Sequence, residues 1–139
     1  MMRWRVLRAA GLSIKRSSIG DRVVIEGRDV FVSEGVEFGA DVFIDATAPV
    51  YLGAGVRVGP GAKILTSIDN VGEATAGADS VAAKPVLIGA GAQIGAGAVI
   101  YPGVTIGERA VIIDDSEVRE NCVPDATYAG VPARLVSEI

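Results

Sequence analysis

Residues 88–107 read IGAGAQIGAGAVIYPGVTIG, in which an aliphatic residue returns at every sixth position and is usually followed by glycine. The same spacing joins Leu52, Val58 and Ile64, and from residue 88 it continues as far as Val118. A period of six fits neither the 3.6-residue turn of an α-helix nor the two-residue alternation of a long strand. It is typical of a short strand followed by a corner, with the aliphatic side chain pointing inward and glycine at the bend.

Three such units close a triangular coil of about eighteen residues. We call the inward aliphatic residue of each unit an anchor, and successive coils stack so that each anchor lies beside the equivalent anchor of the next coil. The expected neighbours are Ile88 with Ile106, Ile94 with Ile112, and Ile100 with Val118. Towards the N-terminus the expected anchors are Ile19, Ile25, Phe31, Phe38 and Ile44, followed by Leu52. The steps after Phe31 and Ile44 are seven and eight residues long, so small bulges are expected there.

Residues 65–85 break this rhythm, because Gly, Ser, Ala, Asp and Asn dominate and the anchors disappear. The composition predicts an excursion loop that leaves the stack. The sequence therefore predicts one all-β domain over residues 1–139. Its expected parts are an N-terminal cap (1–18), coils (19–64 and 86–123), the excursion loop (65–85) and a C-terminal cap (124–139) with a short helix near residues 134–139.

Composition excludes several kinds of protein. The 139 residues include no histidine and one cysteine, Cys122, so neither a disulfide framework nor a metal site is predicted. The first sixteen residues carry five cations and no acid, whereas the rest carry eight cations and seventeen acids. We expect the basic segment to be a solvated cap rather than a membrane-binding or polyanion-binding surface, and the acidic body argues against nucleic-acid binding. No secretory signal and no apolar run of about 20 residues is recognised, so a cytoplasmic protein without integral membrane association is expected.

With these motifs in view, the chain resembles the hexapeptide-repeat acyltransferases, the left-handed parallel β-helix family. It is most similar to sugar and polysaccharide acetyltransferases of the maltose, galactoside and colanic-acid type. Three segments carry the resemblance: residues 84–89 (KPVLIG), 94–107 (IGAGAVIYPGVTIG) and 128–134 (YAGVPAR). The resemblance implies a left-handed parallel β-helix and a homotrimer with the active groove between subunits. It also implies transfer of an acetyl or other acyl group from acyl-CoA to a hydroxyl or amine of a sugar or small molecule.

The resemblance also implies site residues. A loop histidine deprotonates the acceptor in this family, and here Asp69 occupies that position, followed by Asn70. Asp45 lies where relatives place an aspartate that contacts the acceptor. The catalytic candidates are therefore Asp69, Asn70 and Asp45, and the cofactor-binding candidates are Gln93, Ala96, Gly97, Arg119 and Arg134. A carboxylate with the ordinary pKa of about 3.9 is a weak base unless burial raises that pKa.

Three hypotheses about function stay open. Acyl transfer from acetyl-CoA or another acyl-CoA is favoured by the resemblance. The second hypothesis is a repurposed enzyme on the same trimeric scaffold, using acid–base chemistry of Asp69 and Asp45 without CoA. The third is a non-catalytic structural or regulatory trimer. Four acids near the expected cofactor groove would repel polyanionic CoA: Asp114, Asp115, Glu117 and Glu120.

Overall fold

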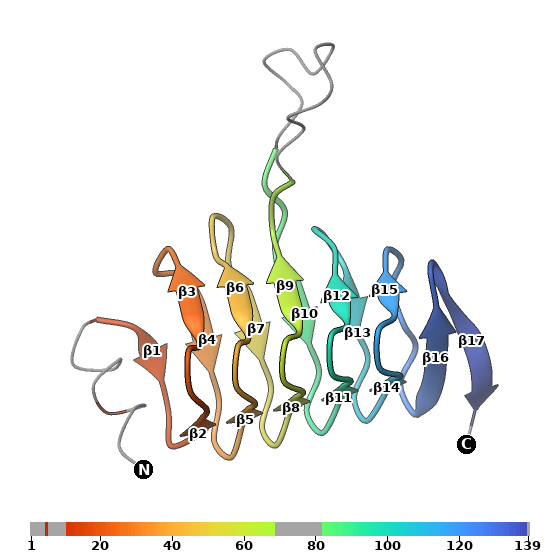
Figure 1. Ribbon diagram of the computed structural model, residues 1–139, viewed down its shortest axis with the longest axis horizontal. Helices are drawn as coiled ribbons and strands as arrows, with labels where there is room; N and C mark the ends of the chain where they lie inside the picture. The colour runs from red at the N-terminus through yellow and green to blue at the C-terminus, as the bar shows by residue number, and fades with distance from the viewer. Residues whose placement is uncertain (1–4, 6–10, 69–81, 139) are drawn as a thin grey trace.

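The computed structural model describes residues 5, 11–68 and 82–138, and it shows a stack of five triangular coils followed by a hairpin (Figure 1). Each coil contributes three short strands. The first two coils hold β1 (Ser13–Ile14), β2 (Ser18–Ile19), β3 (Val24–Glu26), β4 (Val30–Val32), β5 (Glu37–Phe38) and β6 (Phe43–Asp45). The other three hold β7 (Val50–Leu52), β8 (Arg57–Val58), β9 (Lys63–Leu65), β10 (Val86–Ile88), β11 (Gln93–Ile94), β12 (Val99–Ile100), β13 (Thr105–Ile106), β14 (Val111–Ile112) and β15 (Glu117–Val118).

Every strand pairs in parallel with the equivalent strand of the next coil, which produces three sheets along the stack. Sheet A contains β1, β4, β7, β10 and β13, and sheet C contains β3, β6, β9, β12 and β15. Sheet B contains β2, β5, β8, β11 and β14, and it continues into the C-terminal hairpin. The register confirms the three predicted anchor pairs: Ile88 with Ile106, Ile94 with Ile112, and Ile100 with Val118.

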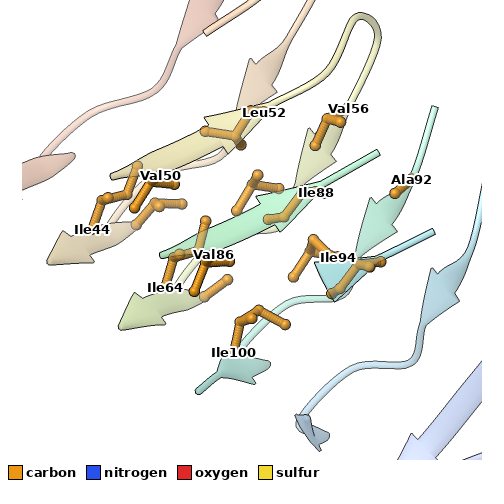
Figure 2. Close-up of a cluster of buried hydrophobic side chains, with 14 of the residues drawn as sticks. Ile44, Val50, Leu52, Val56, Ile64, Val86, Ile88, Ala92, Ile94 and Ile100 are labelled. Carbon is orange, nitrogen blue, oxygen red and sulfur yellow. The ribbon is translucent and has the colours of Figure 1, made fainter. Parts of the chain in front are cut away.

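The core is the space enclosed by the three sheets. The strands point one or two side chains each into this space. Figure 2 shows Ile44, Ile64 and Ile100 forming one ladder, with Leu52 and Ile88 in another. These five side chains are almost completely buried. Because burial of an aliphatic side chain is worth about 1.5–3 kcal/mol, the repeated ladder accounts for the six-residue period.

One predicted anchor is wrong. The inward residues of β4 are Val30 and Val32, which are 0% and 3% exposed, whereas Phe31 is 38% exposed on the outer face of sheet A. Phe31 stacks there on Tyr51 of the next coil, with ring centroids 5.0 Å apart and an interplanar angle of 13°. The long step therefore lies before Val32 and not after Phe31, and the spacing from Val32 to Phe38 is the regular six residues.

Glycine serves two purposes at the corners. The first corner residue faces the next coil closely: a Cβ on Gly59 would lie 2.6 Å from the backbone nitrogen of Ala96. The third corner residue adopts the left-handed conformation, as Gly61 does with φ of 75°. The first purpose confirms the prediction that the glycines after the anchors form structural corners.

Some left-handed corner positions carry charged residues in place of glycine. Arg22 and Asp41 occupy equivalent positions in neighbouring coils, with φ of 58° and 63°, and the guanidinium binds the carboxylate at 2.6 and 3.0 Å. Arg109 and Asp125 repeat the arrangement at another corner with the same two distances. These pairs are exposed, so solvent screens them and each adds little stability.

Both ends of the stack differ from expectation. The predicted helix near residues 134–139 is wrong, because β16 (Ala126–Gly130) and β17 (Ala133–Glu138) form an antiparallel hairpin. The hairpin gives these backbone groups partners, whereas a helix of six residues is marginal in water. At the other end, β1 already pairs with β4, so the first coil begins at Ser13, inside the segment expected to be a cap. None of the described residues lies in a helix that is long and apolar enough to cross a membrane.

The segment without anchors lies between β9 and β10. These strands keep the register of the stack on either side of it: Lys63 pairs with Val99, and Val86 pairs with Val50. The chain therefore leaves and re-enters the stack at one corner, between sheet C and sheet A. Figure 1 shows β9 and β10 meeting there.

Candidate functional site

Polar residues gather where the chain passes from sheet C to sheet A, a region that we call the loop corner. Its described residues are 46–49, 66–68, 82–85, 101–104 and 119–121. Asp45 ends β6 at this corner, and the excursion leaves from the same corner in the next coil. Tyr101 and Arg119 occupy the two coils after that. The stacked coils therefore place side chains from four successive coils along one edge.

Asp45 holds the base of the excursion. Asp45 is only 8% exposed, and its carboxylate accepts four hydrogen bonds. Oδ1 accepts from the backbone N–H and hydroxyl of Thr47 at 3.1 and 2.6 Å, and Oδ2 accepts from the backbone N–H and hydroxyl of Ser67 at 2.9 and 2.6 Å. The Thr66 hydroxyl adds a bond to the Asp45 carbonyl oxygen at 2.9 Å and accepts one from the Ala48 N–H at 2.9 Å.

These contacts decide the charge of Asp45. Burial opposes ionisation, but the hydrogen bonds from Ser67 and Thr47 outweigh it, so the pKa of the carboxyl is lowered. A carboxylate with a lowered pKa and both oxygens occupied is a poor proton acceptor. The structure thus gives Asp45 a positioning role at the loop base, and its contact with an acceptor stays a prediction. Asp69 and Asn70, which follow Ser67 closely in the chain, lie outside the described residues.

Arg119 is engaged by two neighbours at the loop corner. Its Nη2 lies 3.0 Å from Glu117 Oε1 and donates to the Tyr101 hydroxyl at 3.1 Å. The guanidinium also lies over the Tyr101 ring, 4.1 Å from the centroid. The Tyr101 hydroxyl donates to Glu117 at 3.2 Å, and burial together with that bond raises the tyrosine pKa. Arg119, a predicted cofactor-binding residue, is thus already paired with a carboxylate.

An open groove of about 620 Å³ runs along the outer face of sheet B. Gln93 lines this groove, in register with Arg57 and Val111 of the neighbouring coils. The groove ends at the corner that joins sheet B to sheet C, which we call the groove corner (residues 20–23, 39–42, 59–62, 95–98 and 113–116). Ala96 and Asp114 line it there, and the Ala96 N–H donates to Asp114 Oδ1 at 2.9 Å.

The predicted cofactor-binding residues do not form one cluster within a single chain. Gln93, Ala96 and Gly97 lie on sheet B and the groove corner. Arg119 lies at the loop corner, across sheet C, and Arg134 lies on β17, 4.0 Å from Glu120. Within the described ranges, no three His, Cys, Asp or Glu side chains are arranged to hold a metal ion. Cys122 is buried, and burial raises its thiol pKa to about 11, so it is not a reactive nucleophile.

Sheet A carries an apolar column that the sequence analysis missed. Phe31, Tyr51 and Leu87 are in register on three successive coils, and each is about 40% exposed. They line a second groove of about 440 Å³. Each is the middle residue of a triplet (VFV, VYL and VLI) whose outer two residues are aliphatic and point inward. The two-residue alternation inside these triplets was the signal that could have identified the column.

Comparison with known families and structures agrees with this architecture. Residues 85–119 match the family model described as bacterial transferase hexapeptide (six repeats). Residues 85–119 therefore carry the hexapeptide repeat that this family model describes.

Solved structures of acetyltransferases share the fold of this chain. A hexapeptide-repeat containing acetyltransferase from Vibrio cholerae O1 biovar eltor, complexed with acetyl coenzyme A, is 26% identical with a TM-score of 0.89, over 98% of this chain and 75% of that one. A maltose O-acetyltransferase from Clostridium difficile 630 is 26% identical with a TM-score of 0.87, over 97% and 73%. A galactoside acetyltransferase in complex with coenzyme A is 25% identical with a TM-score of 0.78, over 88% and 64%. The family expected from the sequence is thereby confirmed, as is the left-handed parallel β-helix.

Proposed function

We propose that this hexapeptide-repeat protein is an acyltransferase that moves an acetyl or other acyl group from acyl-CoA to a hydroxyl or amine of a sugar or small molecule. The observation that carries the proposal is the shared fold, over nearly the whole chain, with an acetyltransferase solved in complex with acetyl coenzyme A. The sheet B groove supports it, because the expected cofactor contacts Gln93 and Ala96 both line that groove. We place this activity in the cytoplasm.

The proposed enzyme is a homotrimer with its active groove between subunits. Two observations support this assembly. The catalytic candidates belong to the loop corner and its excursion, whereas the cofactor-binding candidates Gln93 and Ala96 lie on the other side of sheet C. Contact between two subunits would bring the catalytic candidates of one next to the cofactor-binding candidates of the other. The apolar column of Phe31, Tyr51 and Leu87 leaves exposed surface of the kind that subunit interfaces cover.

Asp69 is proposed as the residue that accepts or orients the acceptor proton, with Asn70 beside it in the sequence. An acceptor hydroxyl needs a base in its transition state, and this chain has no histidine to supply one. Asp45 supports Asp69 indirectly, because it anchors Ser67 just before it in the chain. Gln93, Ala96 and Gly97, together with Arg119 and Arg134, are proposed to hold the acyl donor.

Calorimetric titration with acetyl-CoA, at low and at moderate salt, tests the proposal. Saturable binding is expected, followed by release of free CoA when a panel of sugar and amine acceptors is added. Asp69→Ala should lower turnover about a hundredfold, whereas Asp79→Ala, which removes another carboxylate of the same segment, should not. Absence of any binding at millimolar acetyl-CoA would contradict acyl transfer. It would favour the alternative, a repurposed enzyme that works without CoA. The pairing of Arg119 with Glu117 supports this alternative, because it occupies one of the cations proposed to hold the acyl donor.

A further inference from the structure

One carboxylate lies where the sheet B groove meets the groove corner. Most backbone amides along the groove bond from coil to coil: those of Gly39, Gly59 and Gly95 donate to carbonyl oxygens of the adjacent coil at 2.7–2.8 Å. Ala96 is different, because its N–H donates to a side chain, Asp114 Oδ1, at 2.9 Å. Among the described residues that line the groove, Ala96 is the one whose backbone N–H donates to a carboxylate.

We propose that Asp114 sets the affinity of this groove for acyl-CoA, by occupying the Ala96 N–H that a bound donor needs. This inference rests on the proposed function. Acyl-CoA carries thioester and amide carbonyl oxygens, which accept hydrogen bonds, and a backbone N–H at the edge of a groove is a suitable partner for them. While the Ala96 N–H donates a hydrogen bond to Asp114, an acyl-CoA molecule must displace the carboxylate before it can use that amide.

The Asp114 carboxylate also fills space at the groove corner. A Cβ placed on Gly95 would lie 2.6 Å from Asp114 Oδ1, so the carboxylate lies directly against the glycine that lines the groove. A ligand that follows the groove to the Ala96 amide therefore meets both the volume and the negative charge of this side chain. Binding requires the carboxylate to turn away, and solvent is available to it because Asp114 is exposed.

Asp115 supplies a matched control. It carries the same charge at the same corner and is also exposed, but its carboxylate lies against Gly97 and is not part of the groove lining. Its own backbone N–H donates to the Ala96 carbonyl oxygen at 2.8 Å, a bond that a side-chain change leaves in place. Removal of either aspartate changes the electrostatic repulsion of CoA phosphates similarly, whereas only removal of Asp114 frees the amide.

The test is calorimetric titration of acetyl-CoA into the wild type, D114A, D114N and D115A. D114A is expected to bind about tenfold more tightly than the wild type, because it removes both the competing acceptor and a charge. D115A and D114N, which remove charge while the amide can stay capped, are expected to gain about threefold or less. Hydrogen exchange of the Ala96 amide in the ligand-free protein should accelerate in D114A and stay unchanged in D115A.

The outcomes separate this role from the proposed function. If the wild type binds acetyl-CoA and D114A binds no more tightly than D115A, the role of Asp114 is overturned and acyl-CoA binding stands. Unchanged Ala96 exchange in D114A overturns it as well. If neither the wild type nor D114A binds acetyl-CoA, both the proposed acyl-CoA function and the proposed role of Asp114 are overturned.

Discussion

Ser67 donates two hydrogen bonds to one carboxylate oxygen of Asp45, from its backbone N–H at 2.9 Å and from its hydroxyl at 2.6 Å. The two residues are 22 positions apart, at the same corner of adjacent coils. Asp45 ends β6, and Ser67 is where the chain has begun to leave the stack. This pair therefore fixes the direction in which the excursion departs, and Thr47 completes the arrangement by occupying the second carboxylate oxygen.

Replacement of Asp45 by alanine is expected to destabilise the protein by about 2–3 kcal/mol, because two backbone and two hydroxyl donors lose their acceptor in a largely buried place. Urea unfolding followed by circular dichroism measures the change. Ser67→Ala, which removes one of the four donors, should cost about 1 kcal/mol. Equal stability of Asp45→Ala and the wild type would show that the network does not hold the loop base.

The lowered pKa of Asp45 predicts how the stability of the fold depends on pH. Its pKa in the folded protein lies below the ordinary value of 3.8, so ionised Asp45 stabilises the fold fully above that value. The contribution is lost as the pH falls from about 3.8 towards the lowered pKa, because the unfolded state takes up the proton first. Unfolding midpoints of the wild type and Asp45→Asn between pH 6 and 2.5 should converge as the pH falls. A constant difference across that range would contradict the assignment.

The six-residue period of the sequence predicted most of the fold. Because three six-residue units make one coil, residues about eighteen positions apart are expected to pair between neighbouring coils. Ile88 beside Ile106 is an example. The pattern failed where adjacent residues are both apolar: Phe31 and Val32 can each serve as an anchor by composition, and only the pairing with β7 decides between them. The helix predicted near residues 134–139 was wrong because residues 134–138 belong to β17, which pairs with β16, the strand just before it in the chain.

The site was harder to predict than the fold. The resemblance to acetyltransferases suggested Gln93 and Ala96 as cofactor-binding candidates, and both line one groove in the structure. It did not indicate that Arg119 is held by Tyr101 and Glu117, because that cluster depends on stacking of residues from different coils. Motifs record which residue types recur, whereas the pairing state of a charged side chain depends on neighbours about one coil away in the sequence.

Two glycine variants should separate close coil packing from backbone conformation. Gly59→Ala is expected to destabilise by about 2–3 kcal/mol, since its Cβ would lie 2.6 Å from the Ala96 nitrogen and backbone must move. Gly55→Ala should cost about 1 kcal/mol, because φ is 72° but no atom lies within 4 Å of the added Cβ. Chemical denaturation of both variants measures the difference. The explanation fails if Gly55→Ala is the more damaging change.

The apolar column on sheet A predicts where the subunits meet. Tyr51 lies in the middle of the column, stacked on Phe31 and in register with Leu87, and a charge there would have to be desolvated in an interface. Tyr51→Glu is therefore expected to convert the proposed trimer into monomers, seen as a threefold drop in mass by light scattering after size exclusion. Val136→Glu is the matched control, because Val136 is also an exposed apolar residue but lies on the terminal strand β17. A trimer that persists in Tyr51→Glu, or that dissociates equally in Val136→Glu, would remove sheet A as the interface, and a monomeric wild type would remove the trimer itself.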